Sequence, residues 1–167
     1  MHTIAQTPRL IIREFLPEEQ ETYLHHFTDE EVLLYLPQRT TEERINIFQT
    51  ALANYANSKL TGIWGMFNKE TGEFIGSCLL RPFNGDVKVL EVGYSMDKKY
   101  WGQGIATEMA EAMITHGFSD TDIDEIVGVT VLENISSQRV LEKAGLKRID
   151  NLFRDGLELA FFRKVRD

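Results

Sequence analysis

One acidic side chain in the middle of the chain stands where it could serve catalysis. Glu91 lies inside Val87–Met96, a run rich in β-branched and aromatic residues that predicts a strand. A carboxylate in such a run is costly to bury unless it is paired or lines a cleft. Partial burial would raise its pKa toward the range useful to a general base. Glu91 is therefore the candidate base or water-orienting residue, with a structural glutamate as the alternative.

A glycine pair follows this strand. Gly102 and Gly104 stand just ahead of Ile105–Phe118, whose apolar residues recur at helical spacing. The first N–H groups of a helix have no partner inside it, and the helix dipole directs its positive end toward them. Because glycine leaves no Cβ between backbone and ligand, the turn predicts a phosphate site. The alternative is a turn that only redirects the chain.

Two common phosphate-binding motifs do not fit this turn. A P-loop requires a lysine after its last glycine, and Ile105 follows Gly104 instead. A Rossmann fingerprint requires a third glycine, and that place holds Thr107. The glycine pair therefore belongs to neither a P-loop nor a Rossmann fingerprint, and another type of phosphate site must be considered.

A second polar motif follows the next predicted strand, Ile126–Leu132. Its sequence is Asn-Ile-Ser-Ser-Gln-Arg-Val-Leu-Glu-Lys-Ala-Gly-Leu, residues 134–146. The pattern predicts a helix over Ser136–Ala144 that ends at Gly145. Asn134 could form an ordinary turn here, with Ser136 as the helix cap.

Together the two motifs resemble those of the GNAT superfamily of N-acetyltransferases, over nearly the whole chain. In the family pattern Arg/Gln-x-x-Gly-x-Gly/Ala the first place here holds Trp101, a departure that the RimJ/RimL-like branch often tolerates. The wider string Tyr-Trp-Gly-Gln-Gly-Ile-Ala-Thr-Glu also looks like that branch. The resemblance implies that the pyrophosphate of acetyl-CoA binds at Gly102, Gln103, Gly104, Ile105, Ala106 and Thr107.

The same resemblance implies how the pantetheine arm would be held. In GNAT enzymes the central strand and the next one splay apart, and the arm lies in the gap. Gly93 predicts a bulge or a close approach of backbones, which would set the backbone of Tyr94 and Met96 against the cofactor. By resemblance, Asn134 would hydrogen-bond the pantetheine.

A departure from the family concerns the group that protonates the leaving thiolate. Many GNAT enzymes carry a tyrosine for this purpose in the last-motif helix, where this chain has Leu141. As in the RimL-like branch, Ser137 offers a hydroxyl, so it is the second candidate catalytic residue, with capping or packing as its alternative role. No Cys/His/Asp spacing predicts a metal site. Cys78, in an apolar run, is expected to be a buried hydrophobe.

The elements that must position these residues follow from the pattern. Strands are predicted at Arg9–Phe15, Ile63–Phe67, Phe74–Pro82, Val87–Met96, Ile126–Leu132, Lys147–Leu152 and Leu157–Arg163. Further helices are predicted over Glu18–Phe27, Glu30–Tyr35 and Thr41–Asn57, with Thr41 as an N-cap lacking a full capping box. The order predicts an α+β (mixed α/β), GNAT-like fold with a central, twisted, mostly antiparallel sheet of about seven strands flanked by helices.

Length and composition limit the number of domains, the partners and the cellular location that are expected. The length suits one domain, so residues 1–167 are expected to form a single N-acetyltransferase domain. The net charge of −8 argues against nucleic acid and anionic membranes as partners. No run approaches the ~18 apolar residues of a membrane span, and the N-terminus lacks a signal-peptide layout. With a single cysteine, these features predict a cytoplasmic protein.

The predicted function is acetyl transfer from acetyl-CoA to a primary amine. Direct attack is expected, because no residue has the setting of an activated nucleophile. The acceptor stays open between a ribosomal-protein N-terminus, an amino acid, a polyamine and an antibiotic amine, in a pocket near Phe83; a homodimer is compatible with the resemblance. The alternative is a non-catalytic acyl-CoA-binding module, which the cleft acid Glu91 disfavours.

Overall fold

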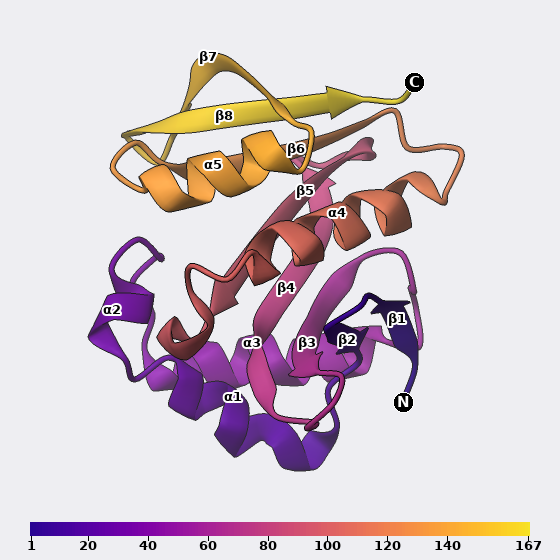
Figure 1. The fold of residues 1–167 in the computed structure, drawn as a ribbon, viewed down its shortest axis with the longest axis vertical. Helices are drawn as coiled ribbons and strands as arrows, with labels where there is room; N and C mark the ends of the chain where they lie inside the picture. The colour runs from indigo at the N-terminus through magenta and orange to yellow at the C-terminus, as the bar shows by residue number, and fades with distance from the viewer.

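The computed structural model describes residues 1–167 and shows one open, eight-stranded sheet (Figure 1). The strand order is β1-β2-β3-β4-β5-β6-β8-β7, and only β5 and β6 run parallel. The strands are β1 (Thr3–Gln6), β2 (Leu10–Arg13), β3 (Gly62–Asn68), β4 (Phe74–Phe83), β5 (Asp86–Met96), β6 (Glu125–Val131), β7 (Lys147–Arg154) and β8 (Leu157–Val165). The expected mixed, mostly antiparallel sheet is confirmed.

The expectation of about seven strands misses β1. This edge strand has four residues, of which only Ile4 and Ala5 are apolar, and both are half-buried. It pairs with β2 across a turn at Thr7, whose side chain accepts a hydrogen bond from the Leu10 N–H. A strand this short gives too few alternating residues to form a pattern.

Helices cover both faces of the sheet. They are α1 (Gln20–His26), α2 (Glu30–Leu33), α3 (Thr41–Asn54), α4 (Ile105–Phe118) and α5 (Ile135–Lys143), with 3-10 turns at Pro17–Glu19 and Lys98–Tyr100. Figure 1 shows α4 and α5 across one face, with α1 and α3 packed against the lower part of β3 and β4. The predicted bounds of α4 are confirmed, and none of the helices is both long and apolar enough to span a membrane.

The start of α3 corrects one detail of the sequence analysis. Thr40, rather than Thr41, is the N-cap, and its hydroxyl accepts a hydrogen bond from the Glu43 N–H at 3.1 Å. The Glu43 carboxylate in turn accepts from the Thr40 N–H at 2.9 Å. Moving the cap by one residue completes the capping box that the sequence analysis found absent.

Buried apolar side chains pack on both faces of the sheet and belong to one contiguous core. Under α4, the Cys78 thiol lies 3.8 Å from the Met113 sulfur, and Trp64 meets His116 edge-on. On the opposite face, aromatic rings from α1, α3 and the strands pack at centroid distances of 4.9–6.4 Å. This packing holds α4 against β4 and β5 and α1 against β4, on either side of the candidate site.

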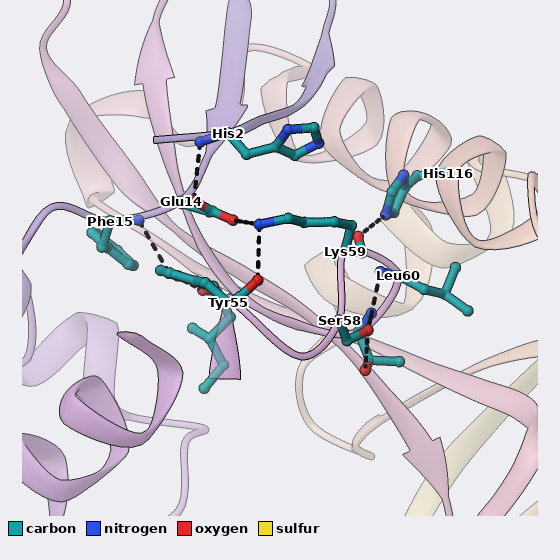
Figure 2. A network of polar contacts seen from close by, with 10 residues as sticks. His2, Glu14, Phe15, Tyr55, Ser58, Lys59, Leu60 and His116 are labelled. Carbon is teal, nitrogen blue, oxygen red and sulfur yellow. Dashed lines mark hydrogen bonds and ion pairs between the residues drawn. The ribbon is translucent and has the colours of Figure 1, made fainter. Parts of the chain in front are cut away.

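A polar network closes the N-terminal edge of the molecule (Figure 2). The Lys59 ammonium donates to Glu14 Oε1 at 2.6 Å and to the Tyr55 carbonyl at 2.8 Å. The His2 N–H donates to Glu14 Oε2, and the Lys59 carbonyl lies 2.8 Å from His116 Nε2 on α4. The loop after α3 is thereby tied to both β1 and α4.

The only parallel pair opens partway along its length. β5 and β6 pair from Val89 with Glu125 to Val92 with Gly128, and no further. Both strands continue, β5 to Met96 and β6 to Val131. Their unpaired ends leave a gap at the carboxyl side of two parallel strands, beside the start of α4. Such an edge is a common ligand site in parallel sheets.

Candidate active site

The turn ahead of α4 has the backbone expected of an anion cradle. Gly102 and Gly104 have φ values of +73° and +78°, a left-handed region that favours glycine. A Cβ on Gly102 would meet no atom within 4 Å, and one on Gly104 only Arg9 Nη2 at 3.5 Å. The space in front of the turn is therefore open, and the unpaired N–H groups at the start of α4 adjoin it.

Arg9, in the turn between β1 and β2, holds this turn in place. Its Nη1 donates to the Gln103 carbonyl at 2.8 Å, and its Nε donates to Glu108 Oε2 at 2.7 Å. The side chains of Ile105 and Ala106 are buried under the sheet-facing side of α4, so only their backbone can serve a ligand. The arginine also neutralises Glu108, the one acid in the first turn of α4.

Trp101 occupies the place where the family pattern has Arg or Gln, and its indole has a structural partner. The indole N–H donates to the Met96 carbonyl at 2.8 Å, which folds the turn back onto the end of β5. The Gln103 side-chain amide donates to the Lys99 carbonyl at 3.0 Å. At this position the polar Arg or Gln of the family pattern is thus replaced by Trp101, whose indole stabilises the turn.

Gly93 lies where the β5–β6 gap begins, and the predicted alternative of a bulge is wrong there. β4 and β5 keep an unbroken register from Gly76 with Met96 to Pro82 with Leu90. A Cβ on Gly93 would come within 3.2 Å of the Leu79 side chain. Glycine relieves a tight contact with the Leu79 side chain, so the close neighbour is a side chain and not the backbone that was the other expectation.

Two hydroxyls meet near this gap. The Tyr94 hydroxyl donates to Ser137 Oγ at 3.4 Å, and burial raises the pKa of the tyrosine. Asn134 is the N-cap of α5, where its Oδ1 accepts from the Ser137 N–H at 3.2 Å. Asn134 therefore fills the capping role suggested for Ser136, and its amide N–H₂ group makes no hydrogen bond within the protein.

Leu141 shows why the family tyrosine is absent from α5. Its side chain is buried against Gly128 of β6, where an added Cβ would come within 2.7 Å of a Leu141 methyl carbon. The Leu141 side chain therefore packs α5 onto the sheet. A hydroxyl for the gap comes instead from Tyr94, on the strand.

Glu91 is buried, but it is also paired with two arginines. Arg154 donates from Nη2 to Oε1 at 2.9 Å and from Nη1 to Oε2 at 3.2 Å, and Arg81 Nη2 donates to Oε2 at 3.0 Å. Burial alone would raise the pKa of Glu91, but the hydrogen bonds and charges of Arg154 and Arg81 outweigh it and hold the pKa below its usual value. The expectation of a raised pKa is wrong for this reason.

The comparisons with known proteins agree with this geometry. The sequence model of the acetyltransferase (GNAT) domain matches residues 9–147. The chain belongs to the GNAT acetyltransferase family. YoaA of Bacillus subtilis (strain 168), an uncharacterized N-acetyltransferase, is 29% identical over 152 residues, covering 89% of this chain and 85% of YoaA.

Solved structures share the GNAT fold along the whole chain. An acetyltransferase from Agrobacterium tumefaciens str. C58 has a TM-score of 0.83 at 21% identity, covering 99% of this chain and 95% of that one. RimL, a ribosomal L7/L12 alpha-N-protein acetyltransferase in complex with coenzyme A, has a TM-score of 0.80 at 17% identity, covering 98% of each chain. The expected GNAT fold and its likeness to RimL are confirmed.

The face of this GNAT domain opposite α4 carries residues that the sequence analysis did not select. His26 of α1 is buried with Nε2 at 2.9 Å from Ser95 Oγ, and burial lowers its pKa to about 4. Beside it opens a cleft of about 570 Å³, lined by Glu21, Thr22, His25, His26, Glu73, Phe74 and Asp97. His25, the preceding residue of α1, also lines this cleft.

Arg81, Arg154 and the side chain of Tyr94 are the other functional candidates that the sequence analysis did not select. Arg81 carried no usable signal, because the turn at Asn84–Gly85 pairs Phe83 with Asp86, and only a register shift between Pro82 and Phe83 brings Arg81 opposite Glu91. Arg154 carried no sequence signal either, since it lies on the edge strand β7 and is 63 residues from Glu91 in sequence.

Proposed function

We propose that this GNAT domain transfers the acetyl group of acetyl-CoA to a primary amine by direct attack. The observation that carries the proposal is one juxtaposition at the β5–β6 gap. The left-handed glycine turn of α4, the free amide of Asn134 and the Tyr94–Ser137 hydroxyl pair all adjoin the unpaired ends of the two strands.

The residues present suit acetyl-CoA. The open space at Gly102 and Gly104 fits a pyrophosphate beside the first N–H groups of α4, including those of Ile105, Ala106 and Thr107. Beyond Val92, β5 has no β6 partner, so its backbone at Tyr94 and Met96 can offer hydrogen bonds to a pantetheine arm on that side, and Asn134 adds a side-chain donor. When bound, acetyl-CoA supplies an activated thioester carbonyl to the amine.

The Tyr94–Ser137 pair is the proposed source of the proton that the leaving sulfur needs. The amine nitrogen forms a bond to the acetyl carbon, the C–S bond breaks, and the sulfur leaves as a thiolate. A tyrosine whose pKa is raised by burial stays protonated near neutral pH, so it can donate to this charge. Ser137 orients the Tyr94 hydroxyl and is the second donor within reach.

Glu91 has a positioning role in this proposal. Its two oxygens hold Arg81 and Arg154, and its lowered pKa keeps it ionised at neutral pH. A carboxylate so engaged is a weak proton acceptor, which favours the water-orienting version of its predicted role over direct proton removal. The proton of the attacking amine then passes to water on the acceptor side of β5.

The acceptor side is the face of β4 and β5 that carries Arg81 and Glu91. Phe83 and Phe161 stack there at 5.4 Å, and the cleft beside His26 opens toward the same face. RimL is a ribosomal L7/L12 alpha-N-protein acetyltransferase, and a protein N-terminus or a small amine would both fit an open face. Within this proposal the enzyme works in the cytoplasm, as a monomer or a homodimer.

The test is an acceptor panel assayed by release of the CoA thiol. Protein N-terminal peptides, amino acids, polyamines and aminoglycosides are each supplied with acetyl-CoA. We expect at least one class to accelerate CoA release at least tenfold over buffer, with the acetylated amine identified by mass. Tight acetyl-CoA binding without acceleration by any amine would favour the non-catalytic acyl-CoA-binding module instead.

A further inference from the structure

The acceptor side holds more positive charge than the proposed reaction requires. Two guanidinium groups, from Arg81 and Arg154, share the single carboxylate of Glu91. This cluster, Arg81–Glu91–Arg154, therefore carries a formal charge of +1 on a chain whose net charge is −8. A buried carboxylate needs only one bidentate arginine to be satisfied, so the second guanidinium is surplus to that pairing.

The two arginines differ in how far they are committed to Glu91. Arg154 uses both terminal nitrogens on the carboxylate, and its side chain is 28% exposed. Arg81 uses only Nη2, and its side chain is 53% exposed. The Nε and Nη1 groups of Arg81 make no hydrogen bond within the protein. Arg81 can thus keep its contact with Glu91 and still offer N–H groups to an anion in solvent.

The free guanidinium lies close to where transfer would occur. Arg81 stands directly opposite Glu91 in the β4–β5 register, and Val92, the next residue along β5, makes the last pair with β6. The gap for the thioester begins at Gly93, one residue further on. A group bound at Arg81 would therefore adjoin the reacting amine on the same face of the sheet.

An aromatic pair lies beside Arg154, the other arginine of this cluster. The rings of Phe83 and Phe161 stack at 5.4 Å with a 27° angle between their planes, and the Arg154 guanidinium lies 5.8 Å from the Phe83 centroid. Apolar walls lower the local dielectric and strengthen a charge pair. A guanidinium beside such a wall matches the planar, bidentate geometry of a carboxylate.

We propose that Arg81 binds a carboxylate of the acceptor, so that the acceptor is an amine that also carries a carboxylate. This inference rests on the proposed acetyl transfer. The carboxylate could belong to a free amino acid or to an acidic residue near the N-terminus of a peptide. Polyamines and aminoglycosides carry only positive charge, so the cluster repels them.

The experiment compares matched acceptors in wild type and in Arg81→Gln. One arm pairs an amino acid with its amide, and the other pairs peptides with Asp or Asn after the N-terminal residue. For carboxylate acceptors, Arg81→Gln should lower kcat/KM at least tenfold, and the carboxylate-to-amide ratio should fall at least fivefold. Because wild type and Arg81→Gln are compared on the same acceptor, any effect of that acceptor's amine pKa on the rate is the same in both and cancels.

Two controls separate recognition from folding. Arg148→Gln makes the same charge change on the opposite face, where Arg148 bonds to Gln138 of α5 and lies over the Phe162 ring. This variant should change neither kcat/KM for carboxylate acceptors nor the carboxylate-to-amide ratio. A carboxylate that lacks the amine should compete with the acceptor but not with acetyl-CoA. Arg81→Gln should weaken that inhibition at least tenfold, and Arg154 still satisfies Glu91 in the variant.

Each outcome has a distinct meaning. The arm with the larger loss identifies the source of the carboxylate. Equal losses for acid and amide, or a wild type that prefers polyamines, would overturn the inference and leave acetyl transfer standing. Failure of every amine to accelerate CoA release, with acetyl-CoA still bound, would overturn the proposed function and this inference together.

Discussion

The Tyr94 hydroxyl donates a hydrogen bond to Ser137 Oγ over 3.4 Å, linking the central strand to α5 beside the β5–β6 gap. This contact brings a phenol to the region where the family pattern would place a tyrosine on α5. The place of that tyrosine is taken by Leu141, which packs on Gly128. The same chemistry can therefore be supplied from a different element.

Tyr94→Phe removes this hydroxyl and little else. We expect turnover to fall roughly 10²-fold, in line with the loss of a general acid, while the Kd for acetyl-CoA changes less than threefold. Steady-state kinetics and calorimetry measure the two quantities. Tyr55→Phe is the control: it loses bonds with the Phe15 N–H and the Ile63 carbonyl, so it should lower stability by about 1–3 kcal/mol and keep turnover. Wild-type turnover in Tyr94→Phe would remove the tyrosine from the mechanism.

Gly104→Val tests the anion cradle. It should weaken acetyl-CoA binding at least tenfold, about 1.4 kcal/mol, because the side chain fills the space where the pyrophosphate would lie. Gly85→Val is a matched control, because Gly85 also has a φ of +78° and open space around it. Gly85 lies in the β4–β5 turn, just before β5 begins, whereas Gly104 follows the other end of this strand. Equal losses of affinity in both variants would trace the effect to backbone strain and not to the cradle.

His26 should make stability depend on pH. Burial lowers its pKa to about 4, whereas the unfolded residue titrates near ~6.5. Between these values the unfolded chain binds more protons, so stability is complete above pH ~6.5 and falls on acidification toward pH 4, by about 1.4 kcal/mol per pH unit at most. Urea unfolding at pH 7.5 and pH 5 measures this slope.

Substitution isolates the contribution of His26 to that slope. His26→Gln should reduce the loss between pH 7.5 and pH 5 by roughly 2 kcal/mol. His116, whose pKa is also lowered by burial, contributes with the same sign, so the difference from wild type is the quantity to measure. The same change at exposed His25 should leave the slope intact, and a wild-type slope in His26→Gln would contradict the assignment.

The fold could be predicted from the sequence further than the site could. Local patterns were enough to predict α4 and the strands that precede and follow it along the chain, because periodicity and glycine placement act within a few residues. The ionisation of Glu91 could not be predicted that way. Its surroundings come from Arg154, which is 63 residues away on β7, and only the pairing of β5, β6, β8 and β7 brings the two together. The pKa of a buried acid depends on such partners, which a single sequence does not reveal.

Glu91→Gln distinguishes a positioning residue from a base. Because the pKa of Glu91 is lowered, it stays ionised at and above neutral pH, and the rate deficit of the variant should be nearly constant from pH 6.5 to pH 9. We expect a deficit of roughly tenfold from disorder of Arg81 and Arg154, measured as the ratio of kcat/KM to wild type. A deficit that shrinks as pH approaches the amine's own pKa would restore the predicted role as a base.

The most direct test of acetyl transfer follows the acetyl group itself. Excess protein is mixed with isotopically labelled acetyl-CoA and an amine identified by the panel, and intact masses of protein, CoA and acceptor are recorded over a single turnover. We predict that the label passes from the thioester to the amine, with one CoA released per amide formed and no mass added to the protein. Cys78→Ala should behave identically, because burial raises the pKa of this thiol and keeps it inert. Label on the protein, or label that stays on CoA at every acceptor concentration, would contradict direct transfer by this GNAT domain.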